Sequence, residues 1–439
     1  MESAKHKNYA LPIAMMFALF AMISFVTGLT NPLGVIIKNQ FGVPNWMSQL
    51  GNAANFIAYA FMGIPAGMLL KRIGYKKTAL AAIAVGIVGV GTQFFSGIVP
   101  ENMAFAIYLT GAFVAGFSMC MLNTVVNPML NTLGGGGKRG NQLIQFGGSL
   151  NSISATIVPI LVGYLMGNAA NATISDAAPA LWIAMGIFAV VFFVLAFMQI
   201  PEPAQEIEAQ KESAEGVKDP HSALSFRHFI LGAVAIFLYV GVEVGIPNFV
   251  NLFLSTPVDA VDSVPGLGYE AALAGSICGT YWFLMLIGRL FGGFLGAKFS
   301  SKAMLTFVSL LGLLFVLLAI FLPETIKVDM PVFQSDISFG LAEVPIGIMF
   351  LILCGLCTSV MWGGIFNLAV EGLGKYTAMA SGIFMVMVCG GGILPLIQGG
   401  VADLFGYMAS YWVVFAALIY MLYYALIGCK NVNKNIPVD

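Results

Sequence analysis

One carboxylate lies well inside an apolar stretch of the sequence. Glu243 belongs to the segment Phe237–Leu254, FLYVGVEVGIPNFVNLFL, which is apolar enough to lie in a membrane but also carries Asn248. A charge buried in lipid costs roughly 2.5–3.5 kcal/mol or more. Glu243 therefore needs an ion-pair partner, a water-filled cavity or a proton, and we expect it to be functional. It follows Arg227 by sixteen residues, about 24 Å of helix, which predicts a position in the outer half of the membrane.

Amide side chains recur in other apolar segments. Asn and Gln offer both a donor and an acceptor, so a group of them suits a ligand rich in hydroxyl groups. Asn123 and Asn127 are four residues apart and would point the same way from a helix. The predicted ligand-binding polar residues are Asn31, Asn52, Asn55, Asn123, Asn127, Gln145, Asn151, Glu243, Asn248, Asn367 and Gln398. The alternative is that each amide only ties two helices together, at about 0.6 kcal/mol per bond.

A ring-shaped ligand also needs an aromatic side chain against its apolar face. Trp362 is the best candidate because it precedes Asn367 by five residues in a glycine-rich segment. Tyr239, Tyr281 and Trp282 are further candidates.

Arg289 is a second charge inside an apolar segment. A buried guanidinium needs a carboxylate or several carbonyl groups, and Glu371 is one candidate partner. We expect Arg289 and Glu371 to form a structural latch rather than to contact a ligand.

The elements that position these residues are membrane spans. The chain is 59% hydrophobic and 9% charged, whereas a soluble domain carries about 25% charged residues. A span needs about 20 apolar residues. The sequence predicts twelve helical spans, at 11–37, 46–70, 77–98, 103–130, 142–167, 179–200, 227–254, 270–297, 302–322, 344–369, 376–402 and 408–428. The predicted fold class is thus an all-α membrane protein.

The positive charges predict the orientation. With both termini in the cytoplasm, nearly all of the 19 lysines and arginines fall on cytoplasmic loops, as the positive-inside rule requires. The exceptions are Lys38 and Lys327, on predicted outer loops, and Arg289. The charged stretch 201–225 then forms a cytoplasmic linker between an N-terminal six-helix bundle, 1–200, and a C-terminal one, 226–439.

The two halves carry similar loop motifs. Aligning Gly67 with Gly293 places Arg72 on Lys298 and Lys76 on Lys302. This suggests a duplicated six-span unit with a site between the halves at the middle of the membrane.

At these residues the sequence resembles the major facilitator superfamily. The segment Gly67–Lys77 resembles the glycine-and-basic signature of its loop 2–3, with Lys71, in the place of the usual acid, and Arg72 as candidate gate residues. Four further stretches are similar to the fucose/glucose/galactose/N-acetylglucosamine symporter family, namely Leu122–Pro128, Tyr239–Val244, Met361–Leu368 and Gly390–Gln398.

The resemblance implies two pseudo-symmetric bundles and the transport of sugars. This sequence also departs from the family pattern at two positions. Fucose-type members carry acids in spans one and four that are linked to proton coupling, and Asn31 and Asn123 stand at those positions here. Neither amide can titrate, so Glu243 is the candidate proton-coupling residue.

These observations predict a secondary active transporter that imports a monosaccharide (a hexose, deoxyhexose or N-acetylhexosamine) by proton symport with alternating access. Sodium coupling and uncoupled transport are alternatives, and a membrane solute sensor is an alternative of another class. We expect a monomer in the plasma membrane, the bacterial inner membrane, with no metal, no cofactor beyond the coupling ion and no nucleic-acid partner. His6, His221 and His228 form no cluster and no catalytic Ser/His/Asp set is present, so we expect no enzyme activity.

Overall fold

The twelve predicted spans are present in the computed structural model, which describes residues 9–133, 137–166, 172–200, 221–260, 264–295, 298–334, 338–433 and 435–438. Within those residues twelve helical stretches are long and apolar enough to cross a membrane. Most of the predicted linker, 201–220, lies outside the described residues. The all-α membrane fold is therefore confirmed.

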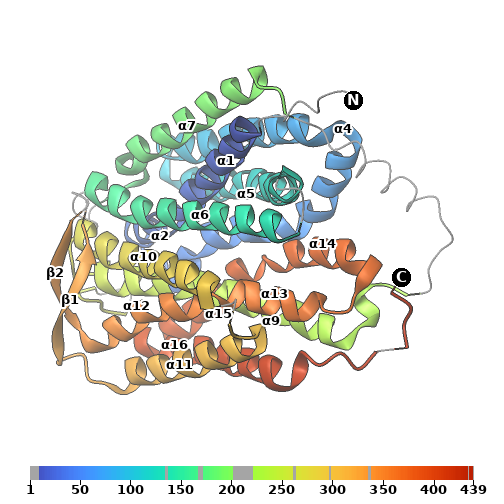
Figure 1. Cartoon of the computed structure of the whole chain (residues 1–439). Coiled ribbons are helices and arrows are strands. Elements are labelled where there is room, and N and C mark those ends of the chain that lie inside the picture. The colour runs from blue at the N-terminus through green and yellow to red at the C-terminus, as the bar shows by residue number, and fades with distance from the viewer. Residues whose placement is uncertain are drawn as a thin grey trace.

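The first six spans form one half of the molecule, drawn in blue to green in Figure 1. Their helices are α1 (Ala10–Gly28) with α2 (Thr30–Phe41), α4 (Leu50–Ser96), α5 (Glu101–Leu133), α6 (Gly137–Met166) and α7 (Ala178–Phe197). The short α3 (Asn45–Ser48) precedes α4, and the 3-10 helix η2 (Ile174–Ala177) precedes α7. Helix α4 contains two spans, separated near Gly74, whose φ of 82° is one that glycine adopts without strain.

The last six spans form the other half, drawn in yellow-green to red in Figure 1. Its helices are η3 (Ala223–Ser225), α9 (Arg227–Ser255), α10 (Ala271–Leu295), α11 (Ser301–Phe321), α12 (Ile346–Thr358) with α13 (Met361–Val370), η4 (Gly374–Tyr376), α14 (Thr377–Met387) with α15 (Gly390–Phe405), α16 (Tyr407–Tyr423) and the π-helical turn η5 (Tyr424–Gly428). Three spans are interrupted, at Leu29, at Ser359 and at Val388. The first interruption lies two residues before Asn31, close to where Pro32 predicts one.

A β-hairpin is the largest element of the described structure that the sequence did not predict. Strands β1 (Lys327–Phe333) and β2 (Phe339–Pro345) pair antiparallel between α11 and α12. This hairpin marks one end of the bundle, which we call the hairpin end. The end at which α1 begins and the chain finishes is the terminal end (Figure 1).

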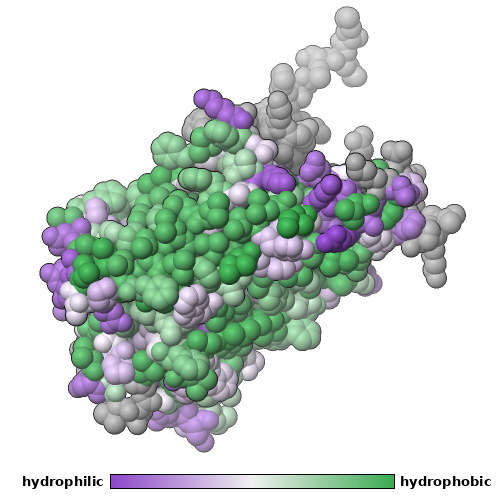
Figure 2. Space-filling model, turned by 90° about the horizontal axis from the view of Figure 1, so that it is seen from below, coloured by the Kyte–Doolittle hydropathy of each residue, from purple (hydrophilic) through white to green (hydrophobic). Residues whose placement is uncertain are grey.

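The surface agrees with a membrane location. Figure 2 shows a broad hydrophobic face, with hydrophilic residues gathered mainly toward its two ends. Large apolar side chains such as Phe193, Phe307 and Ile397 are exposed on the spans. Lipid is the environment that such a face requires.

The halves meet along several helix pairs in the described residues. Helix α6 lies beside α10 (Figure 1), α4 packs against α14 and α15, and α2 packs against α9. The α6–α10 contact is close because Gly163, Gly275 and Gly279 each face backbone of the other helix. This interface positions the central polar residues.

Candidate functional site

The two charges predicted inside spans form an ion pair. A nitrogen, Nη2, of Arg289 on α10 lies 3.3 Å from Oε1 of Glu243 on α9. Their side chains are 16% and 15% exposed, so both are largely removed from solvent but remain reachable. The pair balances two charges that would each be costly alone in this environment.

The ion pair corrects one prediction. Arg289 is paired with Glu243 and not with Glu371, whose side chain is exposed and whose carbonyl oxygen lies 3.0 Å from Nε2 of His228. Glu243 lies a little past the middle of α9, sixteen residues after Arg227 and twelve before Ser255.

Arg289 also connects the two halves of the protein. Its Nη1 donates to the carbonyl oxygen of Gly148 at 2.9 Å and to Oγ of Ser152 at 2.7 Å, and both residues are on α6. The guanidinium therefore holds Glu243 of its own half and α6 of the other half at once. Hydrogen bonds from a charged donor are among the strongest in proteins.

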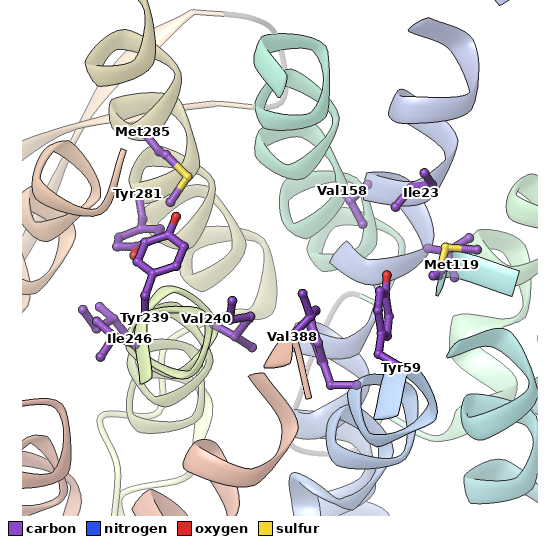
Figure 3. Close-up of a cluster of buried hydrophobic side chains, with 14 of the residues drawn as sticks. Ile23, Tyr59, Met119, Val158, Tyr239, Val240, Ile246, Tyr281, Met285 and Val388 are labelled. Carbon is purple, nitrogen blue, oxygen red and sulfur yellow. The ribbon is translucent and has the colours of Figure 1, made fainter. Parts of the chain in front are cut away.

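Aromatic residues surround the ion pair. The ring of Tyr239, one turn before Glu243 on α9, lies 6.2 Å from the ring of Trp362 on α13. Tyr281 of α10 is buried beside Trp282, and its hydroxyl lies 3.0 Å from Oγ1 of Thr358. Figure 3 shows Tyr239, Tyr281 and Met285 gathered together. The predicted aromatic residues thus lie close to the predicted acid.

A second polar group lies in the N-terminal half. Nδ2 of Asn123 donates to the hydroxyl of Tyr59 at 3.0 Å, and Nδ2 of Asn127 donates to the carbonyl oxygen of Asn123 at 3.0 Å. Both amides are only partly buried. In the view of Figure 3, Val388 and Val240 lie between Tyr59 and Tyr239.

Three of the predicted amides make buried hydrogen bonds within the protein. Asn52 donates to the carbonyl oxygen of Gly391 at 2.8 Å, and Asn248 donates to Oε1 of Gln49 at 3.0 Å, so each links the two halves. Gln398 donates to Oγ of Ser410 at 3.3 Å inside the C-terminal half. These contacts fit the alternative that amides tie helices together.

The remaining predicted residues are dispersed. Asn55 is buried, Asn151 accepts a hydrogen bond from Ser24 through its backbone oxygen, and Asn367 is exposed. Arg72 is exposed at the terminal end. The side chains of Asn31, Gln145 and Lys71 lie outside the described part of the structure.

A network at the hairpin end closes the space between the halves. Lys38 of α2 is 3% exposed and donates to the hydroxyl of Tyr407 and, at 3.0 Å, to Oγ1 of Thr256. Tyr407 in turn donates to Oδ1 of Asn45 at 2.9 Å. The carboxylate of Asp403 accepts from the backbone N–H groups of Asn45, at 2.7 Å, and Trp46, at 3.0 Å. We call these residues the hairpin-end latch.

Burial therefore differs along the axis of the bundle. Lys38, Asn45, Thr256 and Tyr407 of the latch are buried, as is Asn248, whereas Asn127, Glu243 and Trp362 near the centre are partly accessible. The hairpin end is thus closed by buried hydrogen bonds between the halves, and the polar side chains at the centre keep partial exposure.

Sequence reasoning missed several of these residues. Lys38 was placed on an outer loop but lies inside a buried helix, so that prediction is wrong. Tyr59, Ser152, Thr256 and Tyr407 carry no charge and look like ordinary span residues. Lys38 alone could have been found from the sequence, because a lysine directly after an apolar run can still belong to the same helix.

The fold and the buried polar centre between two six-span halves define a polytopic membrane transporter. A model of the Major Facilitator Superfamily matches residues 15–396. The chain belongs to the Major Facilitator Superfamily, as its loop motif and duplicated halves predict. It is accordingly a transporter and not an enzyme.

Curated relatives match over nearly the whole chain. It is 29% identical over 435 residues to a protein of Brucella abortus (strain 2308) named glucose/galactose transporter, with 98% of this chain and 97% of the relative covered. It is 23% identical over 426 residues to the L-fucose-proton symporter of Escherichia coli (strain K12), covering 92% and 90%.

Solved structures share the fold. The chain superposes on the E. coli fucose:proton symporter with a TM-score of 0.65 at 19% identity, covering 97% of this chain and all of the other. The inward-open E. coli xylose transporter gives a TM-score of 0.67 at 12% identity, covering 97% and 96%.

Proposed function

We propose that this protein imports a monosaccharide by proton symport, with the two halves rocking about a site between them. The observation that carries the proposal is the ion pair of Glu243 and Arg289, which lies where the halves meet and stays partly accessible. The names of the relatives, glucose/galactose transporter and L-fucose-proton symporter, support a sugar as the cargo.

The centre suits the chemistry of a sugar. Asn123, Asn127 and Tyr59 offer donors and acceptors on one side, and Arg289 and Glu243 do so on the other. Trp362 supplies an aromatic surface of the kind that packs against a sugar ring. Hexoses, deoxyhexoses and N-acetylhexosamines all present these groups, and glucose and galactose are the first to test.

Proton coupling would act through the ion pair. While Glu243 is ionised, Arg289 holds it and α6 together. A proton on Glu243 neutralises the carboxylate and weakens its attraction for Arg289, which changes how the guanidinium is held between Glu243 and α6. Loading and rocking are then linked by one side chain that contacts both halves.

The positive-inside rule supports cytoplasmic termini, in a bacterial inner membrane. The closed hairpin end would then be the outer one. We expect the protein to act as a monomer. Sodium coupling, uncoupled transport and solute sensing remain the competing functions.

Transport by purified protein in liposomes tests the proposal. Counterflow of labelled glucose, galactose, fucose and N-acetylglucosamine would measure exchange without a gradient. Accumulation under an imposed pH gradient, under a sodium gradient and under neither would identify the coupling ion. We expect counterflow of at least one sugar and accumulation under the pH gradient only. Sodium-driven accumulation would support the sodium alternative, and exchange without accumulation would support a facilitator. The absence of counterflow for every sugar would overturn sugar transport.

A further inference from the structure

A buried hydroxyl beside the ion pair lacks a well-aligned hydrogen bond. Tyr239 is 0% exposed, and its hydroxyl oxygen makes no hydrogen bond of good geometry among the described residues. It lies near enough to Glu243 and Arg289 to interact electrostatically with both. Leaving a buried hydroxyl unpaired costs about 1–3 kcal/mol, so an unpaired one needs an explanation.

The neighbouring guanidinium of Arg289 also has N–H donors that are not used in hydrogen bonds. Arginine has five N–H donors. The contacts with Gly148, Ser152 and Glu243 use three of them in the described structure, two through Nη1 and one through Nη2. The Glu243 carboxylate and the Arg289 guanidinium are each partly exposed, so a polar ligand can reach them.

A second tyrosine provides an internal comparison. Tyr281 is as buried as Tyr239 and also lies within electrostatic range of Glu243, but its hydroxyl is paired with Thr358 at 3.0 Å. The fold can therefore satisfy a tyrosine in this region. At Tyr239 it leaves the hydroxyl unpaired next to two charges and the half-buried ring of Trp362.

We propose that the Tyr239 hydroxyl is a substrate-binding group that completes its hydrogen bonding with one hydroxyl of the sugar, while Trp362 packs beside the ring. This inference rests on the proposed function and goes beyond it by assigning one recognition contact. The sugar hydroxyl replaces the missing partner, so binding removes a penalty that the empty protein bears. Tyr239 thereby helps to determine which hydroxyl group of the sugar the protein recognises.

Tyr239→Phe tests the assignment, with Tyr411→Phe on α16 as the matched control. Tyr411 is equally buried, is not among the proposed site residues, and donates from its hydroxyl to the carbonyl oxygen of Ile246 at 3.2 Å. Each variant removes one hydroxyl from a buried tyrosine, but only Tyr411 loses a well-aligned hydrogen bond. We expect Tyr239→Phe to keep or raise the melting temperature of the empty protein and to weaken sugar binding about 3- to 10-fold. Tyr411→Phe should lower the melting temperature and leave the affinity unchanged.

Monodeoxy derivatives of D-glucose and D-galactose identify the hydroxyl concerned. For wild type, one deoxy position should lose affinity about 3- to 10-fold, and Tyr239→Phe should show no further loss at that position. If wild type binds a sugar but Tyr239→Phe keeps both its affinity and its deoxysugar profile, the inference is wrong while the proposed function stands. If wild type neither binds nor exchanges any sugar tested, both the inference about Tyr239 and the proposed function are wrong.

Discussion

At the scale of single residues, the central fact is that one arginine contacts both halves of the protein. Arg289 contacts Glu243 within its own half and Gly148 and Ser152 in the other half. Lysine could not reproduce this arrangement, because its ammonium is a point charge without the planar fork of donors.

Glu243→Gln should separate coupling from movement. Glutamine keeps an acceptor for Arg289 but cannot be protonated, so sugar exchange should continue while accumulation under a pH gradient is lost. Counterflow and gradient-driven uptake in liposomes measure the two activities. A glutamine variant that still accumulates sugar to the wild-type level would show that Glu243 does not carry the proton.

The energetics of the pair give a second prediction. Removing one partner of a buried ion pair leaves an uncompensated charge and costs about 3–5 kcal/mol, whereas removing both often costs much less. Arg289→Gln and Glu243→Gln should therefore each lower the melting temperature of the purified protein more than the double variant does. If the double variant instead lowered the melting temperature by the sum of the two single losses, solvent would already be screening the two charges.

These residues were only partly predictable from the sequence. Glu243 and Arg289 stood out because charges are rare in apolar segments, but which charge pairs with which depends on how α9 and α10 pack. Counting along one helix could not supply that. Asn52 and Asn248 show a related limit, because a buried amide has the same sequence pattern whether it binds a ligand or ties two helices.

At the scale of elements, glycine sets the distance between the halves. A Cβ atom added at Gly275 would lie 2.4 Å from the carbonyl oxygen of Pro159, and one at Gly163 would lie 2.4 Å from that of Ala271. Helices α6 and α10 can approach this closely only because neither glycine has a side chain there.

Gly275→Ala should therefore force α6 and α10 apart. Overpacking a close contact costs roughly 1–3 kcal/mol, so we expect a lower melting temperature and slower counterflow. Gly186→Ala on α7 is the control, since an added Cβ there meets nothing within 4 Å. A similar change in both variants would argue that helix flexibility, rather than packing at the interface, decides the result.

The elements themselves were largely predictable. Twelve apolar runs separated by charged loops specify twelve spans, and their observed bounds differ by a few residues. The hairpin was missed, although Met330 and Val332 alternate with exposed Asp329 and Pro331. Proline argues against a strand in general, but it is accepted in a two-stranded ribbon where its nitrogen needs no partner.

At the scale of the whole molecule, the hairpin-end latch opposes any opening on that side. Lys38 and Asn45 come from the N-terminal half, and Thr256, Tyr407 and Asp403 come from the other. Their hydrogen bonds must break before the halves can separate there. The latch therefore belongs to the conformation seen here and holds it.

Tyr407→Phe should weaken this closure. The hydroxyl of Tyr407 contacts Lys38, Thr256 and Asn45, and each lost bond is worth about 1 kcal/mol. The hairpin-end-open population should rise on the order of tenfold or more. Asn251 is buried close to the latch, so in an Asn251→Cys background the rate of labelling by a membrane-impermeant maleimide measures opening at the hairpin end. An unchanged labelling rate would show that the latch does not limit opening.

The ion pair also has an electrical consequence. With Glu243 ionised, the charges of Glu243 and Arg289 cancel, so an empty carrier moves no net charge when its halves rock. With a proton on Glu243 the same centre carries one positive charge. A membrane potential acts on a unit charge with about 2.3 kcal/mol per 100 mV across its full thickness. Inward passage of the loaded carrier would then be driven by a negative interior, while the return of the empty carrier would be insensitive to voltage.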